Sequence, residues 1–222
     1  APRREKLSAL FAGHRLVIPA GTFKVRANDT DYRFRPHSAF AWLTGIPGSE
    51  AVPDTVLVFE PHGAGHDVYL YLHPRSSRES TEFFRDRRHG ELWVGRNPTA
   101  KEAEVAYGIK VRHINDLATD IANKSDTILV RGEDVKVDGL IGAHEREGEL
   151  LQMLAELRLI KDDFELEEMR KAVEATVRGF EDVVRALPDA MKSDRGERII
   201  EGAFYTRART DGNDVGYDTI AA

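Results

Sequence analysis

The sequence predicts an α/β fold, with a mixed sheet in residues 1–158 and a helical part with one strand in residues 159–222. Three observations predict it. Short runs rich in valine, isoleucine and leucine alternate with segments whose apolar residues recur at helical spacing. Two of the short runs are joined by a polar connection with two glycines, which is typical of a hairpin. Beyond residue 158 a long helical pattern takes over, so we expect a domain boundary there.

The first part alternates between expected strands and expected helices. The strands are Arg15–Pro19, Thr55–Phe59, Asp67–Leu72, Glu91–Val94 and Thr127–Val130, with residues 61–66 as the hairpin connection. The helices are Arg3–Ala12, Ala100–Tyr107, Ile114–Ala122 and Glu147–Leu157. Strands interleaved with helices around one hairpin favour an α/β layer over an all-β or all-α fold.

Two amphipathic helices are expected in the second part. Asp162 and Asp163 are good capping residues, and the apolar positions from Phe164 onward keep a period near 3.6. Pro188 is expected to stop this helix. Asp194 and Glu197 resemble a capping box that opens the next helix.

An extended piece over Val215–Ile220 is expected to close the chain as a strand. This strand has no visible partner, and the two helices must bury their apolar faces against something. Either residues 163–222 dock on the first domain, or the chain is the front piece of a larger protein. We favour truncation, because a large uncovered apolar face is unusual in a finished soluble protein.

Composition excludes several classes of function. The 32 basic and 38 acidic residues give a net charge of −6, which argues against a nucleic-acid surface over the whole chain. No apolar run approaches the length that crosses a bilayer, so we expect no membrane partner. The absence of cysteine removes disulfides, thiolate nucleophiles and cysteine metal sites, and fits a cytoplasmic location.

Two groups of residues could hold a cation, and each has a simpler interpretation. His62, His66 and Asp67 flank the glycine-rich turn, but a solvated hairpin tip is favoured over a metal site. On the expected terminal strand Asp214 and Asp218 would point to one face. They could bind a divalent cation, and a solvent-facing edge is somewhat favoured.

Three further features stay open on the residues alone. Asp29 and Asp31 either form turns or stand on a functional loop with Arg35 as a buried partner. Trp93 suits the core or an interface, with the core favoured. The basic residues Arg85, Arg87 and Arg88 interleave with acidic ones, so a solvated surface is favoured over contact with phosphate or nucleic acid.

Five segments, in order, resemble the Xaa-Pro aminopeptidases (aminopeptidase P) of the creatinase/prolidase-like metallopeptidases. The first resembles that family's N-terminal signature, a Tyr and an Arg followed by Ser-x-Phe and a stretch that ends in Leu-Thr-Gly. The last resembles the strand that precedes the active-site loop. The segments are Asp29–Gly45, Tyr69–Leu72, Glu91–Arg96, Glu156–Ala172 and Gly212–Ile220.

The resemblance implies an N-terminal domain of RNase H-like topology over residues 1–158, then the beginning of a pita-bread catalytic domain over residues 159–222. In the family that domain holds two divalent metal ions, usually manganese, through two Asp, one His and two Glu. All five ligands would follow the strand with Tyr217, so the resemblance places them beyond Ala222. It leaves no catalytic residue and no metal ligand in this chain, which we expect to be inactive alone.

Three site residues are implied by the resemblance. Tyr217 matches a Tyr beside the metal centre, and Asp29 matches a carboxylate that reaches the active-site region. Trp93 matches a Trp contributed to the pocket of a neighbouring subunit, which implies a homo-oligomer, a dimer or a tetramer. The family's Arg that lines the site has no clear match, because Ile141–Gly148 diverges.

The implied activity is release of the first residue from peptides that carry proline in second position. Two metals would lower the pKa of a bridging water, and the hydroxide formed would attack the scissile carbonyl. The alternatives are a prolidase-type dipeptidase and, from another class, a non-catalytic relative that binds proteins or peptides. Residues 91–96 and the long first domain favour the aminopeptidase.

Overall fold

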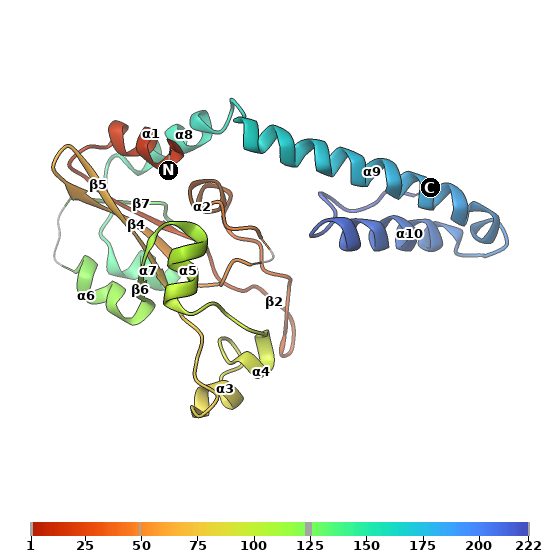
Figure 1. Ribbon diagram of the computed structural model, residues 1–222, viewed down its shortest axis with the longest axis horizontal. Coiled ribbons are helices and arrows are strands. Elements are labelled where there is room, and N and C mark those ends of the chain that lie inside the picture. Colours follow the sequence, from red (N-terminus) through yellow and green to blue (C-terminus); the bar gives the residue numbers. More distant parts are fainter. Residues whose placement is uncertain (1, 49, 123–125, 222) are drawn as a thin grey trace. The chain divides into compact units, whose positions relative to one another are not determined.

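The computed structural model describes residues 2–48, 50–122 and 126–221, which form two units, one ending at Leu159 and one beginning at Ile160 (Figure 1). Within these residues the first unit is built on a five-stranded sheet of order β6-β5-β4-β1-β7. The antiparallel pairs are β1–β4 and β4–β5, and the parallel pairs are β1–β7 and β5–β6. The mixed sheet is confirmed. The strands are β1 (Arg15–Pro19), β4 (Val56–His62), β5 (Gly65–Leu72), β6 (Lys110–His113) and β7 (Thr127–Leu129).

Helices cover both faces of this sheet, because β1 is buried along its whole length. Leu16 and Ile18 belong to a core shared with four helices, and Val17 belongs to a second core shared with two others. The first group is α1 (Pro2–Leu10), α2 (Ser38–Thr44), α5 (Ala100–Tyr107) and α8 (Glu147–Leu157). The second group is α6 (Leu117–Ile121), which follows a 3₁₀ turn at Ile114–Asp116, and α7 (Val135–Leu140).

The expected hairpin forms with a shorter turn than predicted. Its strands pair up to His62 and Gly65, so only Gly63 and Ala64 lie between them. Gly63 has a φ of 59°, the positive value that two-residue hairpin turns require at their first position. A second, two-stranded sheet of β2 (Val25–Ala27) and β3 (Thr30–Asp31) was not predicted.

The strand predicted for residues 91–94 is wrong. Glu91–Val94 is one helical turn, α4, and the amide of Val94 donates to the carbonyl of Gly90 at 3.1 Å. Four apolar residues are too few to separate strand from helix by periodicity. With α3 (Thr81–Arg85), α4 lies in the crossover between β5 and β6, where no strand is offered for pairing.

The second unit is a helical hairpin of α9 (Asp163–Ala190) and α10 (Gly196–Asp211). Asp162 caps α9 as predicted, in a capping box with Glu165. The helices meet where Phe180 and Phe204 pack edge to face, with ring centroids 5.5 Å apart. Arg207 of α10 donates to Asp182 of α9 at 2.7 Å.

Three predictions for this unit are wrong. Helix α9 runs through Pro188 to Ala190, because a proline in the last turn removes only a bond near the helix end. Asp194 is no cap, since Arg195 stands at the N-cap position and caps nothing. Residues 215–220 form bends and no strand, as a strand needs a neighbour and the described residues supply none.

One face of α9 is apolar and exposed in this unit. Side chains at three- and four-residue spacing share it, and each is at least 40% exposed: Leu166, Met169, Val173, Val177, Phe180, Val184 and Leu187. Among the helices of the described ranges, none combines the length and the apolar character that would let it span a membrane.

Gly179 of α9 makes a close contact with the Phe204 ring of α10. A Cβ there would lie 2.8 Å from the Phe204 ring, whereas a Cβ at Gly202 of α10 would meet nothing within 4 Å. Alanine is favoured over glycine inside a helix by about 1 kcal/mol. We therefore expect Gly202→Ala to stabilise the hairpin and Gly179→Ala to destabilise it by about 1–3 kcal/mol, because the Phe204 ring must move. Hydrogen exchange of the α9 and α10 amides measures both; equal effects would contradict this packing.

Candidate functional site

Two of the three predicted site residues, Asp29 and Trp93, belong to the first unit. The Asp29 side chain is 68% exposed and lies at the β2–β3 turn, where Asn28 adopts a positive φ. Trp93 is 54% exposed on α4, so the favoured core position is wrong. Tyr217 belongs to the second unit and is 85% exposed. Without a strand there, Asp214 and Asp218 share no strand face.

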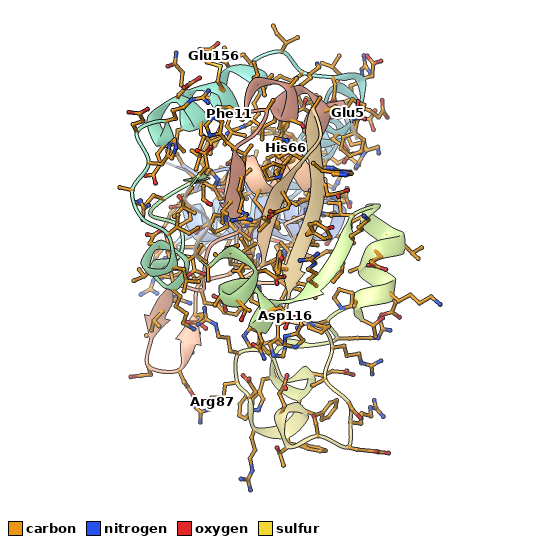
Figure 2. The ribbon with its side chains drawn as sticks, turned by 90° about the vertical axis from the view of Figure 1, so that its left-hand side faces the viewer. Glu5, Phe11, His66, Arg87, Asp116 and Glu156 are labelled. Atoms are coloured by element: carbon orange, nitrogen blue, oxygen red, sulfur yellow. The ribbon has the colours of Figure 1, made fainter. Side chains whose placement is uncertain are left out.

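Trp93 stands on a small lobe, residues 74–99, which holds α3 and α4 at the end of the first unit opposite α1 and α8 (Figures 1 and 2). The amide of Arg75 donates to the carbonyl of Pro98 at 3.0 Å and closes the base of this α3–α4 lobe. The Arg75 guanidinium holds Glu91 with two hydrogen bonds, and it lowers the pKa of that carboxyl.

Arg87, which sequence reasoning left as solvated surface, lies between the two predicted site residues. Its Nη1 is 3.9 Å from Oδ2 of Asp29, and its guanidinium carbon is 5.4 Å from the centre of the Trp93 ring. The Trp93 indole N–H donates to the carbonyl of Phe84 at 2.9 Å, which fixes the ring on the lobe. Figure 2 shows Arg87 at this end of the unit, away from Phe11 and Glu156. Arg35, which one of the two open interpretations made a buried partner, is exposed.

The α3–α4 lobe exposes further apolar side chains besides Trp93. Phe84, Leu92 and Val94 are 54%, 62% and 38% exposed and come from the same short stretch as Trp93. Grouped aromatic and aliphatic side chains with an arginine beside them are typical of contact surfaces. We call Asp29, Arg87, Trp93 and these three residues the Trp93 surface.

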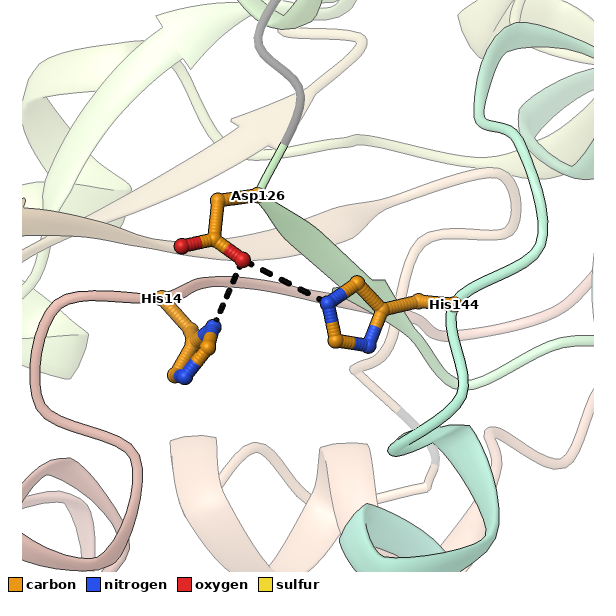
Figure 3. A group of neighbouring side chains, drawn as sticks. All are labelled: His14, Asp126 and His144. Atoms are coloured by element: carbon orange, nitrogen blue, oxygen red, sulfur yellow. Dashed lines mark hydrogen bonds and ion pairs between the residues drawn. The ribbon is translucent and has the colours of Figure 1, made fainter.

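A second group was missed by sequence reasoning, because its members are far apart in the chain. His14, Asp126 and His144 bring ligand-type atoms within 4.8 Å of one another (Figure 3). His14 Nδ1 lies 2.8 Å from Asp126 Oδ1, and this hydrogen bond lowers the pKa of Asp126. Nε2 of His144 lies 3.4 Å from the same oxygen. Arg131 holds the His144 loop by donating to the carbonyls of Ile141 and Gly142.

This group does not fit a metal centre. Nδ1 of His144 accepts a hydrogen bond from the amide of Arg146 at 3.1 Å. The proton of the neutral ring therefore sits on Nε2, where it is donated to Asp126. A metal at Nε2 would move that proton to Nδ1, where it would face the N–H of Arg146, a second donor. Metal-bound histidines normally donate the proton of their other nitrogen to an acceptor. Two histidines bridged by one carboxylate through hydrogen bonds account for the arrangement.

The histidines of the β4–β5 hairpin form no metal site either. Nδ1 of His66 hydrogen-bonds with the Ser8 hydroxyl at 2.7 Å, and its Nε2 donates to the carbonyl of His14 at 2.7 Å. Both ring nitrogens are thereby used to tie α1 and the residue before β1 to the hairpin. His62, 80% exposed, retains a contact with Asp67 at 3.6 Å, which matches the favoured solvated tip.

Comparison with solved proteins gives the class of this fold. Aminopeptidase PepP of Pseudomonas aeruginosa superposes with a TM-score of 0.68 at 23% identity, over 95% of this chain and 48% of that one. A zinc-substituted E. coli aminopeptidase P in complex with product superposes with a TM-score of 0.70 at 20% identity, over 95% of this chain and 49% of that one. The fold is thus that of the front half of aminopeptidase P structures.

Sequence comparison then gives the family. Residues 1–129 match the aminopeptidase P N-terminal domain family, and the chain belongs to it. Xaa-Pro aminopeptidase 1 of Streptomyces coelicolor is 48% identical over 226 aligned residues, which cover 100% of this chain and 45% of that protein. The chain spans about half the length of the curated relatives it matches. The family resemblance seen in the motifs is confirmed.

Gly90 is the residue on which the shape of the α3–α4 lobe depends. A Cβ there would lie 2.4 Å from the carbonyl oxygen of Asp86 and 2.6 Å from that of Glu82, so backbone would have to move. We expect Gly90→Ala to destabilise the lobe and to shift the ¹⁹F resonance of 5-fluorotryptophan at Trp93. Gly148→Ala, on the exposed side of α8 with nothing within 4 Å, is the control. An unshifted Trp93 resonance in Gly90→Ala would contradict this packing.

The tautomer of His144 is a second expected outcome. Long-range ¹H–¹⁵N NMR at neutral pH should show the proton on Nε2, because Nδ1 accepts from the Arg146 amide. His62, whose ring is largely in water, serves as the reference. Addition of Zn²⁺ should leave the His144 signals in place. A proton on Nδ1, or a shift that saturates with zinc, would restore the metal interpretation.

Proposed function

We propose that this chain is the front portion of an Xaa-Pro aminopeptidase, a metallopeptidase that releases the first residue of peptides with proline in second position. The observation that carries the proposal is the alignment of the whole chain with Xaa-Pro aminopeptidase 1 at 48% identity. The likeness to aminopeptidase P structures supports the fold alone, at identities of 20–23%.

The metal ions of the proposed activity fit no group in the described residues. The His14–Asp126–His144 group is saturated by its own hydrogen bonds, and Tyr217 has no cluster of ligands around it. We therefore propose that two divalent ions, with manganese as the expected metal, are held by residues of a longer protein. The family relation supports this, and the zinc-substituted E. coli enzyme shows one relative that takes a metal.

The Trp93 surface would then serve substrate binding between subunits. Its exposed ring and neighbouring apolar side chains support a contact with a second copy in a homo-oligomer, a dimer or a tetramer. A proline ring offers no amide hydrogen, so an apolar wall such as an indole face suits it without leaving a polar partner unpaired. We propose Asp29 and Tyr217 as further substrate-side groups and the cytoplasm as the location.

The exposed stripe of α9 supports a longer protein in its own right. A row of large apolar side chains along one helix is stable in water when another surface covers it. The curated relatives are about twice as long as this chain. We propose that the additional chain of such a protein, the rest of a pita-bread domain that would begin near residue 159, covers this stripe.

The test compares the 222-residue chain with the full-length protein that contains it. With manganese, we expect the full-length protein to release the first residue of Xaa-Pro-Yaa peptides and the 222-residue chain to release none. Cleavage by the short chain would overturn the proposed position of the metal ligands. A full-length protein that binds such peptides without cleaving them would favour the binding module, and one that cleaves only dipeptides would favour the prolidase.

Trp93→Ala in the full-length protein tests the proposed wall. We expect kcat/KM for proline peptides to fall by roughly 10-fold or more, with the metal content unchanged, because the indole contacts are lost. Trp93→Phe keeps a ring beside Arg87 and should retain most activity. Val105→Ala, an exposed residue of α5, is the control. Unchanged kinetics for Trp93→Ala would remove the substrate role of this residue.

A further inference from the structure

Three histidines gather where the α3–α4 lobe joins the sheet. His73 directly follows β5, His113 ends β6, and His89 lies between α3 and α4. The rings of His73 and His89 are stacked, with centroids 4.2 Å apart and an angle of 5° between their planes. The His113 ring lies 5.4 Å from that of His73 at an angle of 59°. The lobe histidine, His89, thus stacks on His73 at the end of β5, and His113 at the end of β6 contacts the same His73 ring.

This arrangement cannot chelate one metal ion through the stacked pair. A metal bound to an imidazole nitrogen lies close to the plane of that ring, along its lone pair. Two parallel rings at stacking distance have no common in-plane point between them. In addition, Nδ1 of His113 accepts from the amide of Asn115 at 3.1 Å, which holds its proton on Nε2 when the ring is neutral. The cluster is therefore suited to binding protons.

The charged groups around the cluster are unequally shared between its two stacked rings. Glu82 Oε1 of α3 lies 3.3 Å from Nε2 of His73, so a charged His73 has a partner. On the side of His89, Asp54 Oδ2 lies 3.7 Å away, but Asp54 is already held by two hydrogen bonds from Arg88.

Asp86, at the end of α3, accepts from the backbone amides of Arg88 and His89 at 2.7 and 3.0 Å. Burial opposes the charge of this carboxylate, yet the two amide bonds together with the nearby histidines lower its pKa. Its bonds go to the main chain, which leaves the His89 ring without a dedicated anion. Nδ1 of His89 is itself buried, with no hydrogen-bond partner among the described residues.

Burial, followed by the neighbouring His73, lowers the pKa of His89 from its ordinary value. A base whose pKa is lowered by folding stabilises the fold while it is neutral. That contribution is complete above the unfolded pKa of about 6.5, and it is lost as the pH falls through the lower folded pKa. The favourable stack of neutral rings then becomes a contact between like charges at 4.2 Å.

We propose that the His73–His89 stack is a proton-sensitive clamp, which holds the α3–α4 lobe against the end of β5 and releases it when both rings are charged. Release moves Trp93 and Arg87, which belong to the same lobe. The proposed release of the lobe is argued from the geometry of the first unit alone. Its consequence, a Trp93 surface that is presented above the transition and withdrawn below it, rests on the proposed function.

The experiment follows the two tryptophans by ¹⁹F NMR of the protein labelled with 5-fluorotryptophan, titrated from about pH 8 to about pH 5. Trp93→Phe assigns the two resonances. We expect the Trp93 resonance to change with an apparent pKa below about 6.5, while the buried Trp42 stays unchanged. A Trp93 resonance that does not change over this range would overturn the clamp.

Substitutions test whether the pH transition of Trp93 arises from the His73–His89 stack. His89→Phe keeps a flat ring against His73 but binds no proton, so it should abolish the Trp93 transition and keep the lobe closed at low pH. His73→Phe is the reciprocal variant, and His62→Gln, at the exposed hairpin tip, should leave the transition as it is. A transition that persists in both phenylalanine variants would overturn the assignment.

A direct titration of the wild-type histidines keeps the test decisive if a variant fails to fold. The Hε1 resonance of His89 should titrate below the ordinary histidine pKa of about 6.5, because burial and the neighbouring His73 lower it. An ordinary titration of His89 would overturn the clamp. The pH dependence of kcat/KM is measured separately on the full-length protein. Absence of peptidase activity there would refute the proposed function and would leave the ¹⁹F result on the clamp unaffected.

Discussion

The first unit depends on one constraint, the complete burial of β1. Its five residues are buried on both faces, and both of its edges are paired, with β4 and with β7. Such a strand requires helices on each side of the sheet, and the alternation of Leu16, Val17 and Ile18 divides the interior into two cores. Even its one charged residue obeys this constraint. The Arg15 guanidinium is 3% exposed and is neutralised by a two-pronged bond to Glu60 on β4.

The mixed sheet also explains why a lobe is present. Because β5 and β6 run parallel, the chain must cross back over the length of the sheet between them, which takes about a dozen residues or more. Helix α5 packs this crossover against the sheet, because its Ala103 is buried in the core. The residues before α5 do not have to cover the sheet, so Phe84, Leu92 and Trp93 can be exposed. A connection that topology demands thus carries the Trp93 surface.

The sequence predicted the elements whose signals are local. Strand β1 and helices α5 and α8 have the predicted bounds, since each has a full apolar pattern between clear end signals. Glu91–Val94 was misassigned because four residues are too few to show a helical or a strand period. The terminal strand was wrongly predicted because a strand forms only where a neighbouring strand can pair with it. The site shows the same limit. The contacts of Arg87 with Asp29 and of His14 with Asp126 join residues 58 and 112 positions apart, which no spacing rule reaches.

Histidines of this chain illustrate how the backbone decides what a titratable side chain can do. In His144 a main-chain amide holds Nδ1, so the ring is fixed in one neutral tautomer, and its carboxylate partner is largely in water. A metal at Nε2 would cost this ring its hydrogen bond from the main chain. In His89 no amide holds the ring; burial and a stacked neighbour act on its charge instead. The first arrangement serves as structure, whereas in the second a bound proton becomes a repulsion between two elements of the fold.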